Sequence, residues 1–171
     1  MDKETLIKAI KIISEQEEKL QFDHFNEDDA WDFGCFMVKK MKENNCPMAV
    51  AIRKLNGSTV FQYLPAGTAA HHALWMDKKF NTVCMRETSS IKFGVELNLI
   101  ECTLEQQRMP VEDFAACGGA FPIRVKGTGI VMVLTASRLP HEQDHAFMVN
   151  CLSEYLGVEV PALDFQVPMG E

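Results

Sequence analysis

Residues 118–137, GGAFPIRVKGTGIVMVLTAS, decide the fold of this chain. The runs 120–126 and 130–137 are rich in apolar and β-branched residues, and they flank the turn Gly127-Thr128-Gly129. Two such runs around a short glycine-containing turn predict a β-hairpin. Strands joined by a tight turn pair antiparallel, so this stretch predicts antiparallel pairing.

A second hairpin is predicted upstream, where the runs 48–54 and 58–64 flank Asn56-Gly57, the strongest short hairpin signal. Apolar periodicity and capping residues predict helices between and around the hairpins, over residues 3–20, 26–44, 69–86, 89–102 and 141–156. Residues 103–117 are expected to be irregular. The sequence therefore predicts an α+β fold, an antiparallel sheet of four strands with helices packed on it.

Charge and hydropathy exclude several classes of protein. The chain has 171 residues, as expected for one domain, with 17 basic and 24 acidic residues and a net charge of −7. No basic run marks a nucleic-acid surface. The longest apolar runs, 48–52 and 130–134, are about a quarter of a membrane span. The N-terminal stretch carries dispersed charges and no signal-peptide pattern, so we expect a cytoplasmic protein without nucleic-acid or membrane partners.

The cysteines form no C-x-x-C pair and no zinc-ribbon spacing. Without a secretory signal they are not expected to form disulfides. We expect buried, reduced thiols, because most of them lie among apolar residues of predicted helices (Cys35, Cys84, Cys102 and Cys151).

His141, Glu142 and His145 form an H-E-x-x-H match. On a helix, both imidazoles would share one face, where they could bind zinc while the carboxylate activates water. Pro140 places His141 in the first helical turn, and no third zinc ligand follows at the usual spacing. A zinc or iron site at His141 and His145 is therefore disfavoured, and the alternative is a polar first turn that complements the helix dipole.

Other polar residues indicate a ligand pocket. Ser89 and Ser90 begin a helix, where backbone amides favour anions, and Trp75 and Lys79 lie one helix earlier. Together they predict an anion site, with solvated lysines and an N-cap serine as the alternative.

The adjacent Gly118 and Gly119 allow either a ligand loop or a tight turn into the strand. The pair His71-His72 indicates surface polarity, with haem ligation as the alternative.

These motifs resemble a known family. The run GGAFPIRVKGTG (118–129), followed by S-x-L-P-x-x-x-D-H (137–145), is similar to the signature of the HbpS-like and GlcG-like proteins, the "heme-degrading domain" family. L-P-x-G-T (64–68), W-x-x-x-K (75–79) and Ser89-Ser90 are most similar to a cytosolic branch of that family without an assigned activity. The resemblance covers about residues 25–156. It departs from the branch at Arg138, His141 and the His71-His72 pair.

The resemblance implies a profilin-like or PAS-like sandwich with five strands, homo-oligomers, and haem or tetrapyrrole binding in some relatives. We expect a single domain over residues 1–171, with a core at about 25–156. The helix 3–20 and the apolar tail 157–171 are then expected to serve subunit contacts.

The leading functional prediction is a cytosolic, oligomeric protein that binds haem, another tetrapyrrole or a small anion. Two alternatives stay open, a haem-degrading or metal-dependent enzyme using His141, Glu142 and His145, and an assembly protein without a small ligand. The residues expected at the ligand site are Trp75, Lys79, Ser89, Ser90, Gly118, Gly119, Phe121, Ser137 and His145.

Overall fold

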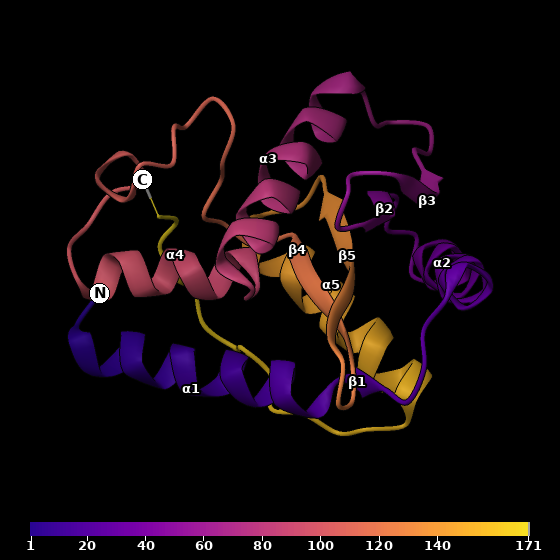
Figure 1. Cartoon of the computed structure of the whole chain (residues 1–171), viewed down its shortest axis with the longest axis horizontal. Coiled ribbons are helices and arrows are strands. Elements are labelled where there is room, and N and C mark those ends of the chain that lie inside the picture. The colour runs from indigo at the N-terminus through magenta and orange to yellow at the C-terminus, as the bar shows by residue number, and fades with distance from the viewer. Residues whose placement is uncertain (171) are drawn as a thin grey trace.

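The structure is a computed structural model that describes residues 1–170. Within these residues five strands form one sheet in the order β1-β4-β5-β2-β3 (Figure 1). Their bounds are Gln21–Phe22 (β1), Ala49–Lys54 (β2), Thr59–Tyr63 (β3), Ala120–Val125 (β4) and Gly129–Ser137 (β5). The pairs β2–β3, β2–β5 and β4–β5 are antiparallel, and both predicted hairpins are confirmed. The predicted α+β class is also confirmed.

The strand β1 is absent from the four strands that hairpin signals predict. Gln21 and Phe22 pair in parallel with Arg124 and Val125 of β4, so the sheet is mixed. A two-residue strand has no alternating pattern to detect, which is why the sequence signal missed it. The five strands implied by the family resemblance are confirmed.

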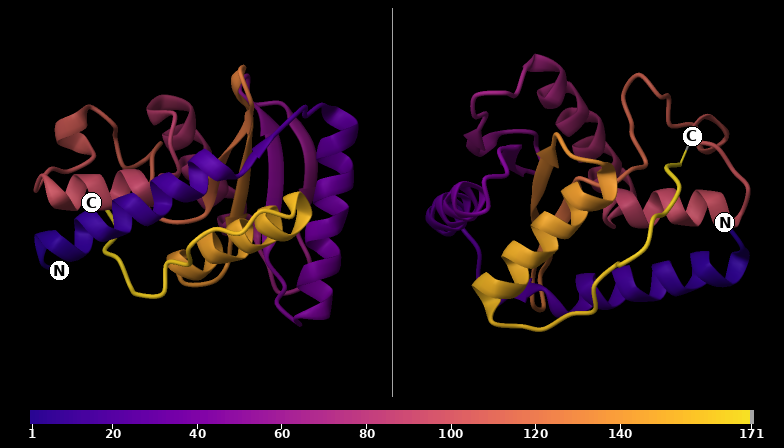
Figure 2. Two further views of the ribbon diagram at one scale, coloured as in Figure 1. Left: turned by 90° about the horizontal axis from the view of Figure 1, so that it is seen from below. Right: turned by 180° about the vertical axis from the view of Figure 1, so that it is seen from behind.

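Helices cover both faces of the sheet (Figures 1 and 2). Their bounds are Lys3–Lys19 (α1), Glu27–Glu43 (α2), Ala70–Arg86 (α3), Ser90–Leu99 (α4) and His141–Leu156 (α5). The helices α2 and α5 pack on one face, α3 packs on the other, and α1 lies along α4. The irregular segment 103–117 holds only a short 3₁₀ turn, Glu105–Gln107. No helix in residues 1–170 is long and apolar enough to cross a membrane.

Strand β2 shows how the sheet serves two cores. Val50 and Ile52 point into the large core under α2 and α5, while Ala49 and Ala51 point toward α3 and meet Met76. The alternation follows from the two-residue period of a strand. The small alanines let α3 lie close to the sheet. As a result, the α3 residues near the ends of β4 and β5 lie directly against the sheet.

Helix α2 begins where its capping residues predict. The Asn26 side chain accepts hydrogen bonds from the backbone N–H groups of Asp28 and Asp29, and the Asp29 carboxylate accepts one from the Asn26 N–H at 2.8 Å. This capping box satisfies donors that a helix start leaves free. The prediction of buried thiols holds for Cys117 and Cys151, but it is wrong for Cys35, which is exposed on the outer side of α2.

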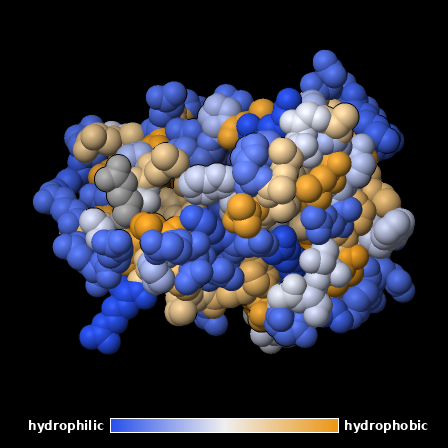
Figure 3. All heavy atoms as spheres, turned by 90° about the horizontal axis from the view of Figure 1, so that it is seen from above, coloured by the Kyte–Doolittle hydropathy of each residue, from blue (hydrophilic) through white to orange (hydrophobic). Residues whose placement is uncertain are grey.

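The C-terminal segment after α5 folds back over its own chain (Figure 2). Val167 is buried in a cluster with Leu6, Ile13 and Val95 of α1 and α4. The Gln16 amide donates to the Pro161 carbonyl at 2.7 Å. The tail and α1 thus cover each other's apolar residues within one chain. The subunit contact expected of them is therefore not needed to bury these residues. On the face seen from above, apolar side chains form separate groups between polar ones (Figure 3).

Candidate functional site

A pocket of about 410 Å³ lies between the N-terminal half of α3, the end of β5 and the start of α5. We call it the Lys79 pocket. It brings together four residues predicted from the sequence, Trp75, Lys79, Ser137 and His141. The other lining residues are His71, His72, Cys117, Arg138, Leu139, Pro140, Asp144 and Met169. Its volume falls in the range of small-molecule sites.

A buried ion pair forms the base of this pocket. The Lys79 ammonium donates to an Asp144 carboxylate oxygen at 3.1 Å and to the Ala136 carbonyl at 3.1 Å. The second Asp144 oxygen accepts from the Leu139 N–H at 3.0 Å. Burial raises the pKa of Asp144, and the adjacent Lys79 charge opposes that rise. Because both groups are held by further hydrogen bonds, the pair is fixed in place rather than free to swing.

The glycine pair before β4 makes room for this arrangement. A Cβ on Gly119 would lie 2.3 Å from the Lys79 Nζ, and a Cβ on Gly118 would lie 1.9 Å from the His141 carbonyl oxygen. Gly119 also has φ = +122°, a conformation that favours glycine. Gly118 and Gly119 therefore shape the site from behind, by letting the lysine and the start of α5 approach the strand.

The walls of the pocket combine cations with apolar surface. The Arg138 guanidinium is anchored to the carbonyls of Gly67 (3.2 Å) and Pro47 (3.0 Å). The pocket lining holds two side-chain cations, Lys79 and Arg138, and one carboxylate, Asp144. Trp75 stands at the rim with 44% of its surface exposed. The pocket thus offers an excess of positive charge beside an aromatic ring.

Both imidazoles of the H-E-x-x-H match bind protein groups. His141 Nδ1 accepts from the Gly118 N–H at 3.1 Å, so its Nε2–H donates to the Val167 carbonyl at 3.1 Å. His145 Nε2 donates to the Gln16 side-chain oxygen at 2.8 Å. Burial lowers the pKa of His141, and burial lowers the pKa of His145 to about 3. Within residues 1–170 no three His, Cys, Asp or Glu side chains are grouped to hold a metal ion.

The remaining predicted residues lie behind the Lys79 pocket or beside it. Ser90 exchanges hydrogen bonds with the backbone of Ala120, and the Ser89 N–H donates to the Glu17 carboxylate at 2.8 Å. Both serines are fully buried, as are Phe121 and His145. The structure therefore does not bring Ser89 and Ser90 into the same pocket as Lys79.

Sequence reasoning missed Arg138, Asp144, Cys117 and Met169 as lining residues. Asp144 carried a signal, since it belongs to the S-x-L-P-x-x-x-D-H run, but its partner Lys79 lies 65 residues away. No sequence signal marks Met169, because it reaches the pocket only when the C-terminal tail folds back.

The family model described as "Haem degrading protein HbpS-like" matches residues 25–153. This chain belongs to the HbpS-like family. The UPF0303 protein YE1367 of Yersinia enterocolitica is 33% identical over 153 residues, covering 89% of this chain and 90% of that protein. A UPF0303 protein of Paraburkholderia phymatum is 36% identical over 149 residues, covering 86% of this chain and 90% of that protein.

Solved structures show the same fold. The Ybr137w protein matches with a TM-score of 0.80 at 25% identity, over 92% of this chain and 96% of that one. A complex of PduOC with haem matches with a TM-score of 0.63 at 14% identity, over 81% of this chain and 97% of that one. The predicted family and fold are thus confirmed.

Proposed function

We propose that this protein binds a small, flat, anionic ligand in the Lys79 pocket, and that haem is the first candidate. The observation that carries the proposal is the convergence of Lys79, Arg138 and Trp75 on one pocket with a single carboxylate, Asp144. A cationic pocket with an aromatic wall attracts planar molecules that carry carboxylates. Membership of the HbpS-like family, and a relative by fold that was solved with haem, support the same choice.

The residues of the pocket suit a haem group. Haem needs an axial ligand, an apolar surface and cations for its propionates. The Ala69 N–H donates to His72 Nδ1 at 2.9 Å, which places the proton of that neutral imidazole on Nε2. The neighbouring His71, which also lines the pocket, would therefore be the iron ligand. Trp75 and Leu139 would contact the ring, and Arg138 would bind a propionate. Bound haem would supply an iron centre for redox or oxygen chemistry.

The role of this chain's own side chains is to hold and orient the ligand. The Lys79–Asp144 pair would fix the floor of the pocket, and because its two charges compensate each other, Arg138 would supply the net positive charge for the bound anion. Arg138, held by two backbone carbonyls, would lose little freedom on binding a carboxylate. We further propose that the protein works in the cytosol as a homo-oligomer.

Titration with hemin tests the proposal. At micromolar protein we expect a shifted Soret band that saturates near one hemin per chain. His71→Ala should alter the position of the band, and Arg138→Ala should weaken binding about tenfold, as expected for the loss of one charged contact.

His24→Ala is the matched control, because His24 is exposed and lies outside the pocket. It should bind hemin as the unmodified chain does. A spectrum that does not change on titration, or equal binding by all four proteins, would refute the haem assignment.

A further inference from the structure

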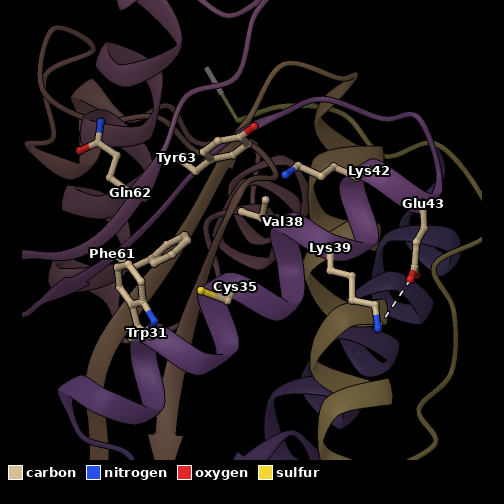
Figure 4. A pocket seen from close by; sticks show the side chains of 9 residues that line it. All are labelled: Trp31, Cys35, Val38, Lys39, Lys42, Glu43, Phe61, Gln62 and Tyr63. Carbon is tan, nitrogen blue, oxygen red and sulfur yellow. Dashed lines mark ion pairs between the residues drawn. The ribbon is translucent and has the colours of Figure 1, made fainter.

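A groove lies away from the Lys79 pocket, along the outer side of α2 and strand β3 (Figure 4). Its volume is about 570 Å³, and its lining residues are Trp31, Cys35, Val38, Lys39, Lys42, Glu43, Phe61, Gln62 and Tyr63. We call it the α2–β3 groove. Strand β3 ends the sheet order, so its outer edge pairs with no strand of residues 1–170. Such an edge is a template for pairing with another chain.

The groove is shaped by close packing at its centre. A Cβ on Gly34 would lie 2.4 Å from the Phe61 ring, so only glycine lets this ring rest on the helix. Trp31 packs edge-on to Phe61 with ring centroids 5.8 Å apart, yet 59% of the Trp31 surface stays exposed (Figure 4). An exposed tryptophan beside an unpaired strand edge is typical of an interaction surface.

The charges of α2 are ordered along the helix. Four of its five acidic residues lie in the first half and all its basic residues in the second half (Glu27, Asp28, Asp29, Asp32; Lys39, Lys40, Lys42). The fifth acidic residue, Glu43 at the end of the helix, pairs with Lys39 and Lys40. Helical spacing puts Asp28, Trp31, Cys35, Val38 and Lys42 on one face. This face runs from acid through apolar residues to base, and Cys35 lies at the middle of the helix. Asp28 and Lys42 are exposed, and neither forms an ion pair within residues 1–170.

We propose that the α2–β3 groove is a two-fold interface that a second copy of this chain fills. An antiparallel α2 from the second copy would place Asp28 against the partner's Lys42 at both ends of the contact. The same axis would pair β3 antiparallel with its copy about Phe61, which is the middle residue of that strand. One surface would thus meet itself, as an isologous contact requires.

The spacing of the β3–β3 contact agrees with the spacing of the α2–α2 contact. Paired strands lie about 4.8 Å apart and packed helices about 8–10 Å apart, so each helix would lie close above its own edge strand. This matches the structure, in which α2 packs mainly on β3. A peptide from another protein would match the acid-to-base order only by chance, whereas a second copy matches it by symmetry. The interface specifies the homo-oligomer proposed above and does not depend on ligand binding.

Oxidative cross-linking through Cys35 tests the axis. A disulfide needs Cα atoms within about 4.4–6.8 Å, which antiparallel helices reach only near their crossing. With a mild copper oxidant we expect a band at twice the 19.3 kDa chain mass on a non-reducing gel. Cys35→Ser should abolish this band, and Cys46→Ser should keep it. A chain that is monomeric at roughly 100 μM, or that cross-links equally without Cys35, would overturn the proposal.

A charge swap tests the pairing itself by analytical ultracentrifugation. Lys42→Glu should face the partner's Asp28 and weaken the dimer at least about tenfold. The double variant Asp28→Lys/Lys42→Glu should restore dimer affinity to within about threefold, because the swapped charges again attract. Lys3→Glu, the same charge change on α1, is the control and should leave the dimer intact. A double variant no tighter than Lys42→Glu would overturn the pairing, while hemin titration judges the proposed function separately.

Discussion

His145 is fully buried, and a positive charge on its imidazole would destabilise the folded protein. Its Nε2–H donates to Gln16, while no group in residues 1–170 reaches its Nδ1. The Nδ1 lone pair therefore has no donor, and the ring has no carboxylate partner to support a charge. Burial lowers the pKa of His145 to about 3, so the folded protein holds a neutral imidazole over most of the acidic range.

Acid should therefore unfold the protein through His145. In the unfolded chain its pKa is about 6.5, above the folded value, so the unfolded state binds the extra proton. The free energy of unfolding should be unaffected by His145 above pH 6.5, and fall as the pH drops from about 6.5 toward 3. Over that window the loss is on the order of 4 kcal/mol. Urea unfolding at pH 7, 6, 5 and 4 measures it.

His145→Gln removes the titration while it keeps a hydrogen-bonding side chain. It should be less stable than the unmodified chain at pH 7, but its stability should depend less on pH between 6.5 and 4. An equally steep pH dependence in His145→Gln would show that other groups carry the acid sensitivity.

At the scale of elements, α4 begins without a side-chain cap of its own. Glu17 of α1 supplies it instead, because its buried carboxylate accepts from the Ser89 N–H at 2.8 Å and from the Thr88 hydroxyl at 2.8 and 3.0 Å. A carboxylate at a helix N-terminus also complements the helix dipole. The contact of α1 with α4 is thus polar at one end and apolar along the rest of its length.

Glu17→Gln should therefore destabilise the protein by about 2 kcal/mol, since a buried charge-assisted cap is lost without a change in volume. The thermal unfolding midpoint at pH 7 measures this. Glu18→Gln, the exposed neighbour on the same helix, is the matched control and should stay within about 0.5 kcal/mol of the unmodified chain. Equal midpoints for the two variants would contradict the cap.

Local signals predicted the elements that local chemistry determines. Asn56-Gly57 fixed one hairpin, and Asn26 fixed the start of α2. Contacts across the chain were not predictable in this way. Glu17 and Ser89 are separated by 72 residues, and nothing at either position marks the other.

The same limit applies to the Lys79 pocket. The motif positions pointed to Lys79, Trp75, Ser137 and His141 as site residues, and all four line one pocket. Ser89 and Ser90 start the helix after Lys79, but neither serine lines the pocket. Their hydroxyl and amide groups serve β4 and α1 instead.

At the scale of the whole molecule, the tail after α5 connects three regions. Val167 packs with α1 and α4, its carbonyl accepts from His141 at the start of α5, and Met169 lines the Lys79 pocket. Gly170 also pairs with Ala116 in an isolated bridge. The tail therefore couples the N-terminal helix to the ligand pocket within one chain.

Two substitutions should separate these roles. Val167→Ala removes two buried methyl groups and should lower the free energy of unfolding by about 1.5 kcal/mol. Met169→Ala changes a side chain that is 54% exposed, so it should leave stability nearly unchanged while it weakens hemin binding. Urea unfolding and Soret titration of both variants make the comparison. Because neither residue lies in the α2–β3 groove, both variants should keep the oligomer size of the unmodified chain in analytical ultracentrifugation. A smaller oligomer in Val167→Ala would instead place the tail between subunits.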